Sequence, residues 1–492
     1  MRTLIFILIA AAVAAGCTVG PVYQKPKVSL EKNFAELSGN ANTNPPPADW
    51  WKTFHDPELE KLINEAGREN YDLQIATLRV REARYQRNIM AGNLLPTVDA
   101  NAGYLRAYGS KNVNLPIGGG DPPDPPGMDA NDDAFENELS VLGKGGLPGV
   151  WSDLYQMGFD ATWEIDVFGG IRRRVEAANE QMQAAVESRR NMAITLSAEV
   201  ARDYMELRGT QERLDIARKN LSDQKIILQV TKSMRTNGLA SDLEVTQAAA
   251  EVATTSATVP PLEATSRRLI HALSILLARE PTALASELEM VKPLPVTPPE
   301  IPVGLPSQLL ERRPDIREAE RQIAAATANI GVAEADLFPK FALTGGSAGI
   351  DSSQPGSLFS LNSRYFLISP TITWRIFDAG RIANNIKLQK AGKEEAVLQY
   401  RSTILTALQE VEDALVMTAT DQARRADLIE ALNQSRQSLA LSRQQYEHGL
   451  SNFLNVLDAE RAVFSAEDNL TQSDESISTD MVALYKSLGG GW

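Results

Sequence analysis

The sequence predicts a mixed fold in which each chain holds two repeats, each made of a two-stranded β-hairpin and a long helical hairpin. The motif at 163–165 (Trp-Glu-Ile) is echoed at 374–376 (Trp-Arg-Ile), 211 residues later. A turn signal at Gly238 recurs at Gly449 with the same spacing. The stretch 171–237 contains no proline and a single glycine, which is typical of one long helix. An internal duplication of one elongated unit explains all three observations.

Composition excludes one class of partner. The chain of 492 residues carries a net charge of −14, and aromatic residues make up only 6% of it. Binding to phosphate backbones needs a basic surface, so we expect no nucleic-acid partner. The low aromatic content suits long helices better than a thick globular core.

The N-terminus reads as an export signal at 1–16 that ends in a lipoprotein box. Arg2 precedes an apolar run, 4–15, that is too short to span a membrane as a helix. Cys17 follows directly and is the only cysteine of the chain. We expect a lipid on Cys17; the alternative is an accidental cysteine in an ordinary signal peptide. The residue after the lipidated cysteine is Thr18 rather than an Asp, which resembles the pattern of lipoproteins that are sorted to the outer membrane.

The first repeat is expected at 56–279. Asp56 and Pro57 are a favourable N-cap and first helical residue, and this helix is expected to reach about Asn93. The predicted segments of this half are a lipid-anchored extended tether at 17–55, strands at about 97–108 and 155–168, a Gly- and Pro-rich surface loop at about 109–150, and a helical hairpin that turns at Gly238 and returns to about Arg279.

The long helices carry a narrow apolar line. Apolar residues recur every seven positions at Val200, Leu207, Leu214, Leu221 and Leu228. A helix of this length reaches roughly 100 Å, and such a narrow line packs against neighbouring helices in coiled-coil fashion.

The second half repeats this order after a Pro-rich linker at 280–313. The second repeat is expected at 314–492, with strands at about 340–350 and 365–377 and a long helical hairpin that turns at Gly449. Four strands cannot form a closed barrel, because roughly eight are the practical minimum. If these strands cross a membrane, several chains must pool them.

Enzymatic chemistry is not indicated. The histidines His55, His271 and His448 lie far apart without the spacing of metal ligands. Neither a phosphate-binding loop nor a nucleophile elbow is present in the sequence. We therefore expect no enzyme, no cofactor and no metal.

The second helical turn offers a different kind of site. Leu454 and Asp458 share one helix face at i and i+4, with Asn455 beside them. Around an oligomer axis they would form an apolar ring and an anionic ring. The alternative is that an early Asp only complements the helix dipole. In the first repeat, Glu244 occupies the position that corresponds to Asn455. Glu244 also fits a capping box with Ser241.

Several motifs together resemble the outer-membrane efflux channel family, the TolC-like proteins, and within it the lipid-anchored OprM/NodT branch. They are Gly16-Cys17-Thr18-Val19-Gly20-Pro21-Val22-Tyr23, Trp50-Trp51, Arg312-Arg313-Pro314-Asp315-Ile316-Arg317, Leu457-Asp458-Ala459 and Leu484-Tyr485-Lys486-Ser487-Leu488-Gly489-Gly490-Gly491-Trp492. The resemblance implies a homotrimer with one twelve-stranded outer-membrane β-barrel on a periplasmic α-barrel, lipid-anchored in the outer membrane.

The same resemblance implies a function and a gate. The protein would be the exit duct of a tripartite efflux pump, with a periplasmic membrane-fusion adaptor and an inner-membrane transporter of the resistance-nodulation-division class. The apolar gate ring falls on Leu454 and the acidic ring on Asp458. Asn455 departs from relatives that place a second acid there. Tyr446 matches a family position that helps to hold neighbouring helices together. Glu244 matches an acidic family position on the other helical hairpin.

The competing interpretation is a structural or adhesive trimeric lipoprotein with a solid coiled-coil stalk. A solid stalk needs apolar residues at both seam positions of each heptad. Here the intervening positions include Gln211, Arg218 and Lys225. These residues favour a hollow wall that is wetted on two faces.

Overall fold

The computed structural model describes residues 18–31, 33–36, 44–108, 151–295 and 302–491. The predicted signal peptide, Cys17, the predicted loop at 109–150 and part of the Pro-rich linker therefore lie outside the described residues. The described chain forms two compact units, which are taken in turn below. The domain limits 56–279 and 314–492 stay predictions.

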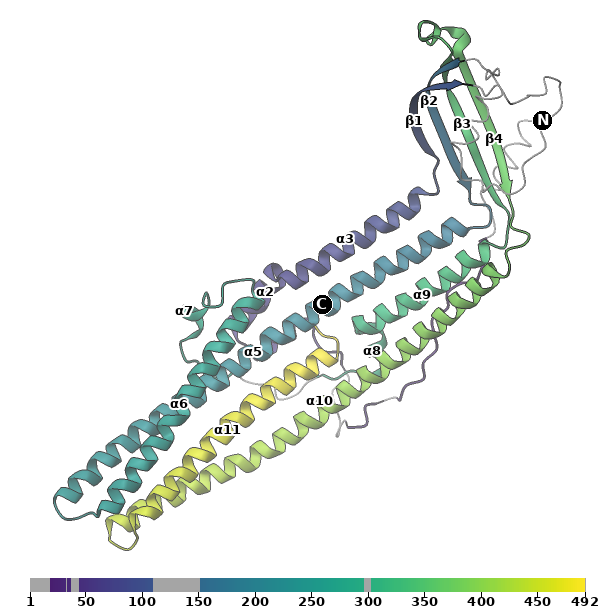
Figure 1. Ribbon diagram of the computed structural model, residues 1–492. Helices are drawn as coiled ribbons and strands as arrows, with labels where there is room; N and C mark the ends of the chain where they lie inside the picture. Colours follow the sequence, from purple (N-terminus) through teal and green to yellow (C-terminus); the bar gives the residue numbers. More distant parts are fainter. Residues whose placement is uncertain (1–17, 32, 37–43, 109–150, 296–301, 492) are drawn as a thin grey trace. The chain divides into compact units, whose positions relative to one another are not determined.

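The first unit contains a four-stranded antiparallel sheet with the order β1-β2-β3-β4 (Figure 1). Its strands are β1 (Thr97–Tyr108), β2 (Trp151–Ile165), β3 (Lys340–Ser352) and β4 (Arg364–Thr373), with short 3₁₀ turns at Pro355–Ser357 and Leu361–Ser363 between the last two. Three of the strands differ from their predicted limits. β2 runs from Trp151 to Ile165 rather than over 155–168, β3 ends at Ser352 rather than at 350, and β4 runs from Arg364 to Thr373 rather than over 365–377.

The two hairpins of the sheet are built in the same way. Thr97 lies opposite Thr162 in the first hairpin, and Lys340 lies opposite Thr373 in the second. The indole Nε1 of Trp163 donates to the carbonyl oxygen of Leu94 at 3.0 Å, and that of Trp374 to Leu337 at 3.0 Å. Each tryptophan thus ties the end of a strand to the end of the preceding helix.

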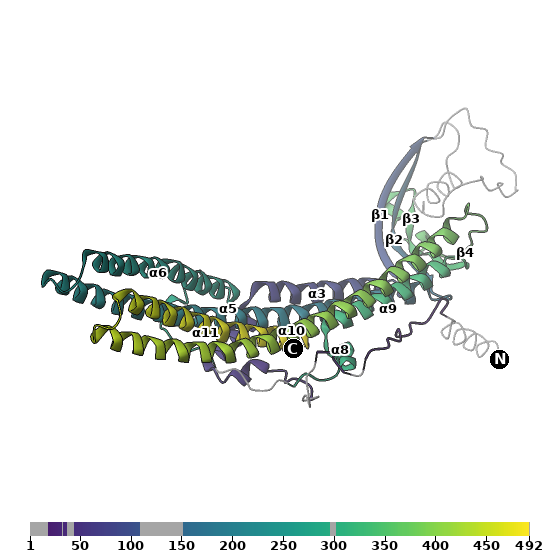
Figure 2. The ribbon, with the colours of Figure 1, turned by 90° about the horizontal axis from the view of Figure 1, so that it is seen from below.

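The second unit consists mainly of helical hairpins, each a long helix that begins in the first unit and a return helix beside it (Figures 1 and 2). These are α5 (Gly170–Thr236) with α6 (Asp242–Leu276), and α10 (Arg381–Glu447) with α11 (Phe453–Ser487). Both long helices have 67 residues and both return helices have 35, with every boundary displaced by 211 residues. The duplication is therefore complete at the level of the helices.

The helix predicted from Asp56 to about Asn93 is divided in two. α2 (Pro57–Glu69) and α3 (Tyr71–Gly92) meet at Asn70. The Asn70 side chain accepts a hydrogen bond from the Leu73 backbone N–H at 3.0 Å and donates to the carbonyl oxygen of Leu276 at 2.9 Å. Asn70 thus caps the second helix and fastens it to the end of α6. The remaining helical segments are η1 (Trp50–Phe54), α7 (Ala285–Leu288), α8 (Pro306–Arg312) and α9 (Pro314–Ala335).

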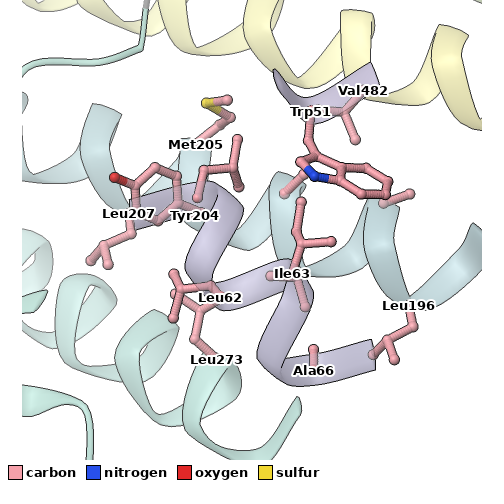
Figure 3. Packing of buried hydrophobic residues seen from close by; sticks show 14 of the residues in the cluster. Trp51, Leu62, Ile63, Ala66, Leu196, Tyr204, Met205, Leu207, Leu273 and Val482 are labelled. Atoms are coloured by element: carbon pink, nitrogen blue, oxygen red, sulfur yellow. The ribbon is translucent and has the colours of Figure 1, made fainter. Parts of the chain in front are cut away.

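A hydrophobic core joins α2, α5 and the ends of the two return helices. Figure 3 shows Leu62 and Ile63 of α2 packed among Tyr204 and Met205 of α5 and Leu273 of α6. Trp50 stacks on Tyr485 of α11 with ring centroids 5.2 Å apart. Among the long helices this core involves only α5, near its middle, from Leu196 to Leu207. It therefore leaves the glycine turns free to carry other functions.

None of the described helices combines the length and the apolar character that a membrane-spanning helix requires.

Candidate functional site

The two glycine turns end the long helices with the same backbone geometry. Gly238 has a φ of +74° and Gly449 a φ of +70°, which is the left-handed region where a side chain is unfavourable. The backbone N–H of Leu239 donates to the carbonyl oxygen of Met234, and that of Leu450 to Gln445, each at 2.8 Å. Local sequence alone therefore specifies both turns.

Each return helix starts with a side-chain cap, and two of the predicted gate residues take part. Ser241 caps α6, and the Glu244 carboxylate accepts from the Ser241 backbone N–H at 2.6 Å, which completes a capping box. Asn452 caps α11 by accepting from the Asn455 backbone N–H at 3.1 Å. The Asn455 amide also donates to Ser451 Oγ at 2.8 Å. Glu244 and Asn455 thus both have local, helix-capping roles.

Leu454, Asn455 and Asp458 lie together on the exposed face of the first turns of α11. Leu454 is 40% exposed, whereas Val456, on the opposite side of the helix, is 5% exposed. Asp458 is also exposed and lies 3.4 Å from Arg461 Nη1. Arg461 binds the buried Glu251 more closely than it binds Asp458.

Tyr446 lies on the other side of the turn, against the first hairpin. Its ring packs on Phe453 with centroids 5.5 Å apart, and both belong to a small cluster with Ala248 and Leu457. Burial raises the pKa of the Tyr446 hydroxyl, and the negative charge of Glu244 raises it further. The structure thus brings Tyr446 and Glu244 together, apart from the exposed face that holds Leu454 and Asp458.

Two ion pairs near the turn were missed by the sequence analysis. Arg461 of α11 binds Glu251 of α6, and Arg443 of α10 binds Glu460 of α11 at 2.9 Å. Burial raises the pKa of Glu460, and the charge of Arg443 opposes that rise. Arg461 and Glu251 lie 210 residues apart, so no local pattern relates them. Arg443 and Glu460 lie 17 residues apart, across the Gly449 turn.

No group of His, Cys, Asp and Glu side chains in the described part of the chain is arranged to hold a metal ion.

The fold and this site define a class of protein: a duplicated chain with long helical hairpins and a small sheet, and with exposed apolar and acidic residues at the turns. Comparison with known proteins identifies the family. The family described as outer membrane efflux protein matches residues 62–274 and 305–490. The chain therefore belongs to the outer membrane efflux protein family, and the resemblance found in the sequence is confirmed.

Relatives and solved structures agree with this assignment. The toluene efflux pump outer membrane protein TtgF of Pseudomonas putida is 32% identical, over 99% of this chain and 97% of the relative. The antibiotic efflux pump outer membrane protein ArpC of Pseudomonas putida is 32% identical, over 100% of this chain and 96% of the relative. The outer-membrane channel OprN superposes with a TM-score of 0.85 at 34% identity, covering 97% of this chain and 100% of that one.

The open state of the MtrE outer membrane channel of Neisseria gonorrhoeae has a TM-score of 0.78 at 28% identity, covering 96% of this chain and 98% of that one. The protein is thus an outer-membrane component of an efflux pump, with a periplasmic helical barrel, and it is a duct rather than an enzyme.

Proposed function

We propose that this protein is the trimeric exit duct of a tripartite pump and that its resting state is closed at the Gly238 and Gly449 turns. The observation that carries the gate is the exposed face of α11, where Leu454 and Asp458 lie one helical turn apart. Three copies around one axis would place three leucines and three carboxylates at a constriction. A narrow, poorly hydrated ring screens such charge less than open water does.

Conductance of the purified channel in planar bilayers tests the gate. Leu454→Ala shortens the apolar ring and should raise leak conductance, and Asp458→Ala should weaken selectivity for cations. Leu405→Ala and Asp427→Ala are matched controls, because these exposed residues of α10 lie away from both turns. If both α11 variants conduct and select as the parent does, the gate lies elsewhere and Asp458 only complements the helix start.

The homotrimer is supported by the four strands that each chain contributes and by the likeness to OprN. The sedimentation mass of the detergent-solubilised protein tests the trimer, and a folded monomer would contradict it.

The periplasmic adaptor and a transporter of the resistance-nodulation-division class follow from the resemblance to the OprM/NodT branch. Co-purification from native membranes would identify both partners, and recovery of a transporter of another class would overturn that assignment.

The lipid anchor on Cys17 rests on the sequence alone. Mass spectrometry of the mature protein should find a lipid-modified Cys17 as the first residue. Cys17→Ala should remove the lipid and leave the protein in the membrane, because the sheet does not depend on the anchor. Relatives named for the efflux of toluene and of antibiotics support these compounds as candidate cargo. Export assays with the intact pump would test that suggestion.

A further inference from the structure

The sheet has two long open edges. In the order β1-β2-β3-β4, the strands β1 and β4 each pair along one side only, within the described residues. β1 has 12 residues and β4 has 10. Unpaired edges of this length expose a row of backbone N–H and C=O groups and are templates for pairing with another strand. The chain's own duplication indicates which strand pairs with them.

The two hairpins have equivalent registers. Val98 lies opposite Ala161 in the first hairpin, and Phe341 lies opposite Ile372 in the second. β4 is therefore the counterpart of β2, displaced by 211 residues. β3 is the counterpart of β1, displaced by 243 residues, so that Lys340 corresponds to Thr97. The seam between β2 and β3 is therefore a template for a seam between β4 and the β1 of a second copy.

The β2–β3 seam then specifies a register. Within one chain, Trp163 lies opposite Leu343, Glu164 opposite Ala342 and Ile165 opposite Phe341. We propose that β4 of one chain pairs antiparallel with β1 of a second copy, so that Trp374, Arg375 and Ile376 lie opposite the partner subunit's Ala100, Asp99 and Val98. This register rests on the proposed trimer and adds to it a defined seam with an ion pair between Arg375 and the partner subunit's Asp99.

Charge supports this register. Asp99 lies directly opposite Asp160 in the β1–β2 pair, and like charges in that position destabilise a sheet. Asp160 accepts a hydrogen bond from Asn101, whereas Asp99 is exposed to solvent. Arg375, also exposed, would bring a cation to the same face of the sheet and offset the repulsion. In the template seam the equivalent pair, Glu164 with Ala342, has no such complement, so the ion pair is specific to the contact between copies.

Apolar exposure and strand length support the same register. Ile376 is 85% exposed and Val98 is 63% exposed, whereas their counterparts in the template seam, Ile165 and Phe341, are both half-buried. β2 continues to Ile165 because β3 lies beside it, and β4 stops at Thr373 where its only partner ends. In the assembly β4 continues to Ile376, which restores most of the strand predicted at 365–377.

Disulfide trapping tests the register. Residues directly opposite in an antiparallel pair have Cα atoms about 4.5–5.5 Å apart, within reach of a disulfide. The variant Ile376→Cys with Val98→Cys should give a covalent trimer on mild oxidation. The matched control, Ile376→Cys with Ala100→Cys, moves one cysteine by two residues on the same face, and single-cysteine variants control for reaction with Cys17.

The outcomes separate the register from the assembly. Cross-linking of the Val98 pair alone supports the proposal, and preferential cross-linking of the Ala100 pair overturns the register. Failure of both pairs in a protein that sediments as a trimer overturns the register and leaves the proposed assembly standing. A protein that sediments as a monomer overturns both.

A charge exchange tests the ion pair separately. Arg375→Asp would place three carboxylates together and should reduce the fraction of trimer that survives in sodium dodecyl sulfate. Adding Asp99→Arg restores opposite charges across the seam and should recover that fraction. If the double variant is no more resistant than Arg375→Asp alone, the two side chains are not neighbours and the ion pair is excluded.

Discussion

The two helical turns have one backbone geometry and two chemistries. In the first turn, Arg235 and Asp242 close the hairpin by a bidentate ion pair of 2.7 and 2.8 Å. In the second, the equivalent positions hold Tyr446 and Phe453, whose rings are in contact. Asp242 is exposed, whereas Phe453 is 5% exposed.

This difference shows how a duplicated unit acquires two roles. An exposed ion pair contributes little to stability and is screened by salt. A buried aromatic residue contributes several times more. The second turn is therefore held to the first hairpin by burial on one face, which leaves Leu454 and Asp458 on the other face to meet the proposed channel axis.

Removing the aromatic contact should break this comparison most strongly. Phe453→Ala deletes a buried ring and should destabilise the second turn by about 3 kcal/mol. Asp242→Ala at the equivalent position should have a much smaller effect, because its ion pair with Arg235 is exposed to solvent. Hydrogen exchange of the turn amides measures both local stabilities. Equal effects of the two variants would mean that burial does not distinguish the turns.

The next effect is a dependence on pH at a position of the second hairpin that has no titratable counterpart in the first. Burial raises the pKa of Glu475 from its ordinary value of 4.5 to about 7, with Arg213 opposing the rise and Glu206 adding to it. The equivalent position of the first return helix is Ala264. Below about pH 4.5 Glu475 is protonated in both the folded and the unfolded chain. Between 4.5 and 7 only the folded chain retains the proton, so this contribution to stability falls as the pH rises.

Hydrogen exchange or chemical denaturation at pH 5 and pH 7.5 should therefore show a less stable α11 at the higher pH. Glu475→Gln, which keeps the neutral shape, should reduce that difference. A pH dependence that is unchanged in Glu475→Gln would assign the titration to another group.

Removing the helix caps should affect the two turns equally. Ser241→Ala and Asn452→Ala each remove the side-chain acceptor at the start of a return helix. The expected loss is about 1 kcal/mol at each site, measured as faster amide exchange in the first turn of α6 or α11. A loss confined to one helix would show that the capping geometry is not equivalent after all.

The smallest effect belongs to the exposed ion pair. Arg235→Ala should lower the local stability of the first turn only slightly at low salt, because its ion pair with Asp242 is exposed to solvent. In about 1 M salt the variant and the parent should be indistinguishable, because the Debye length is then only about 3 Å. An effect of Arg235→Ala that persists in high salt would indicate a packing role for the side chain.

Two features show where local sequence was insufficient. Gln211 was interpreted as wetted, yet it is 2% exposed and its amide donates to the carbonyl oxygen of Leu288 at 2.6 Å. Its partner lies 77 residues away, so no heptad pattern could reveal it. The end of β4 is the second feature, since a strand continues only as far as a neighbouring strand supplies hydrogen bonds.

The sequence by itself determined the duplication, the long helices, both glycine turns and the capping residues, because each depends on backbone preferences within a few residues. It also determined that Leu454 and Asp458 share a helix face. Only the tertiary structure decided that this face is exposed while Phe453 and Leu457 are buried, and that the charge of Glu244 acts on Tyr446. Those outcomes depend on which helices pack together, and packing joins residues that have no local relation in the chain.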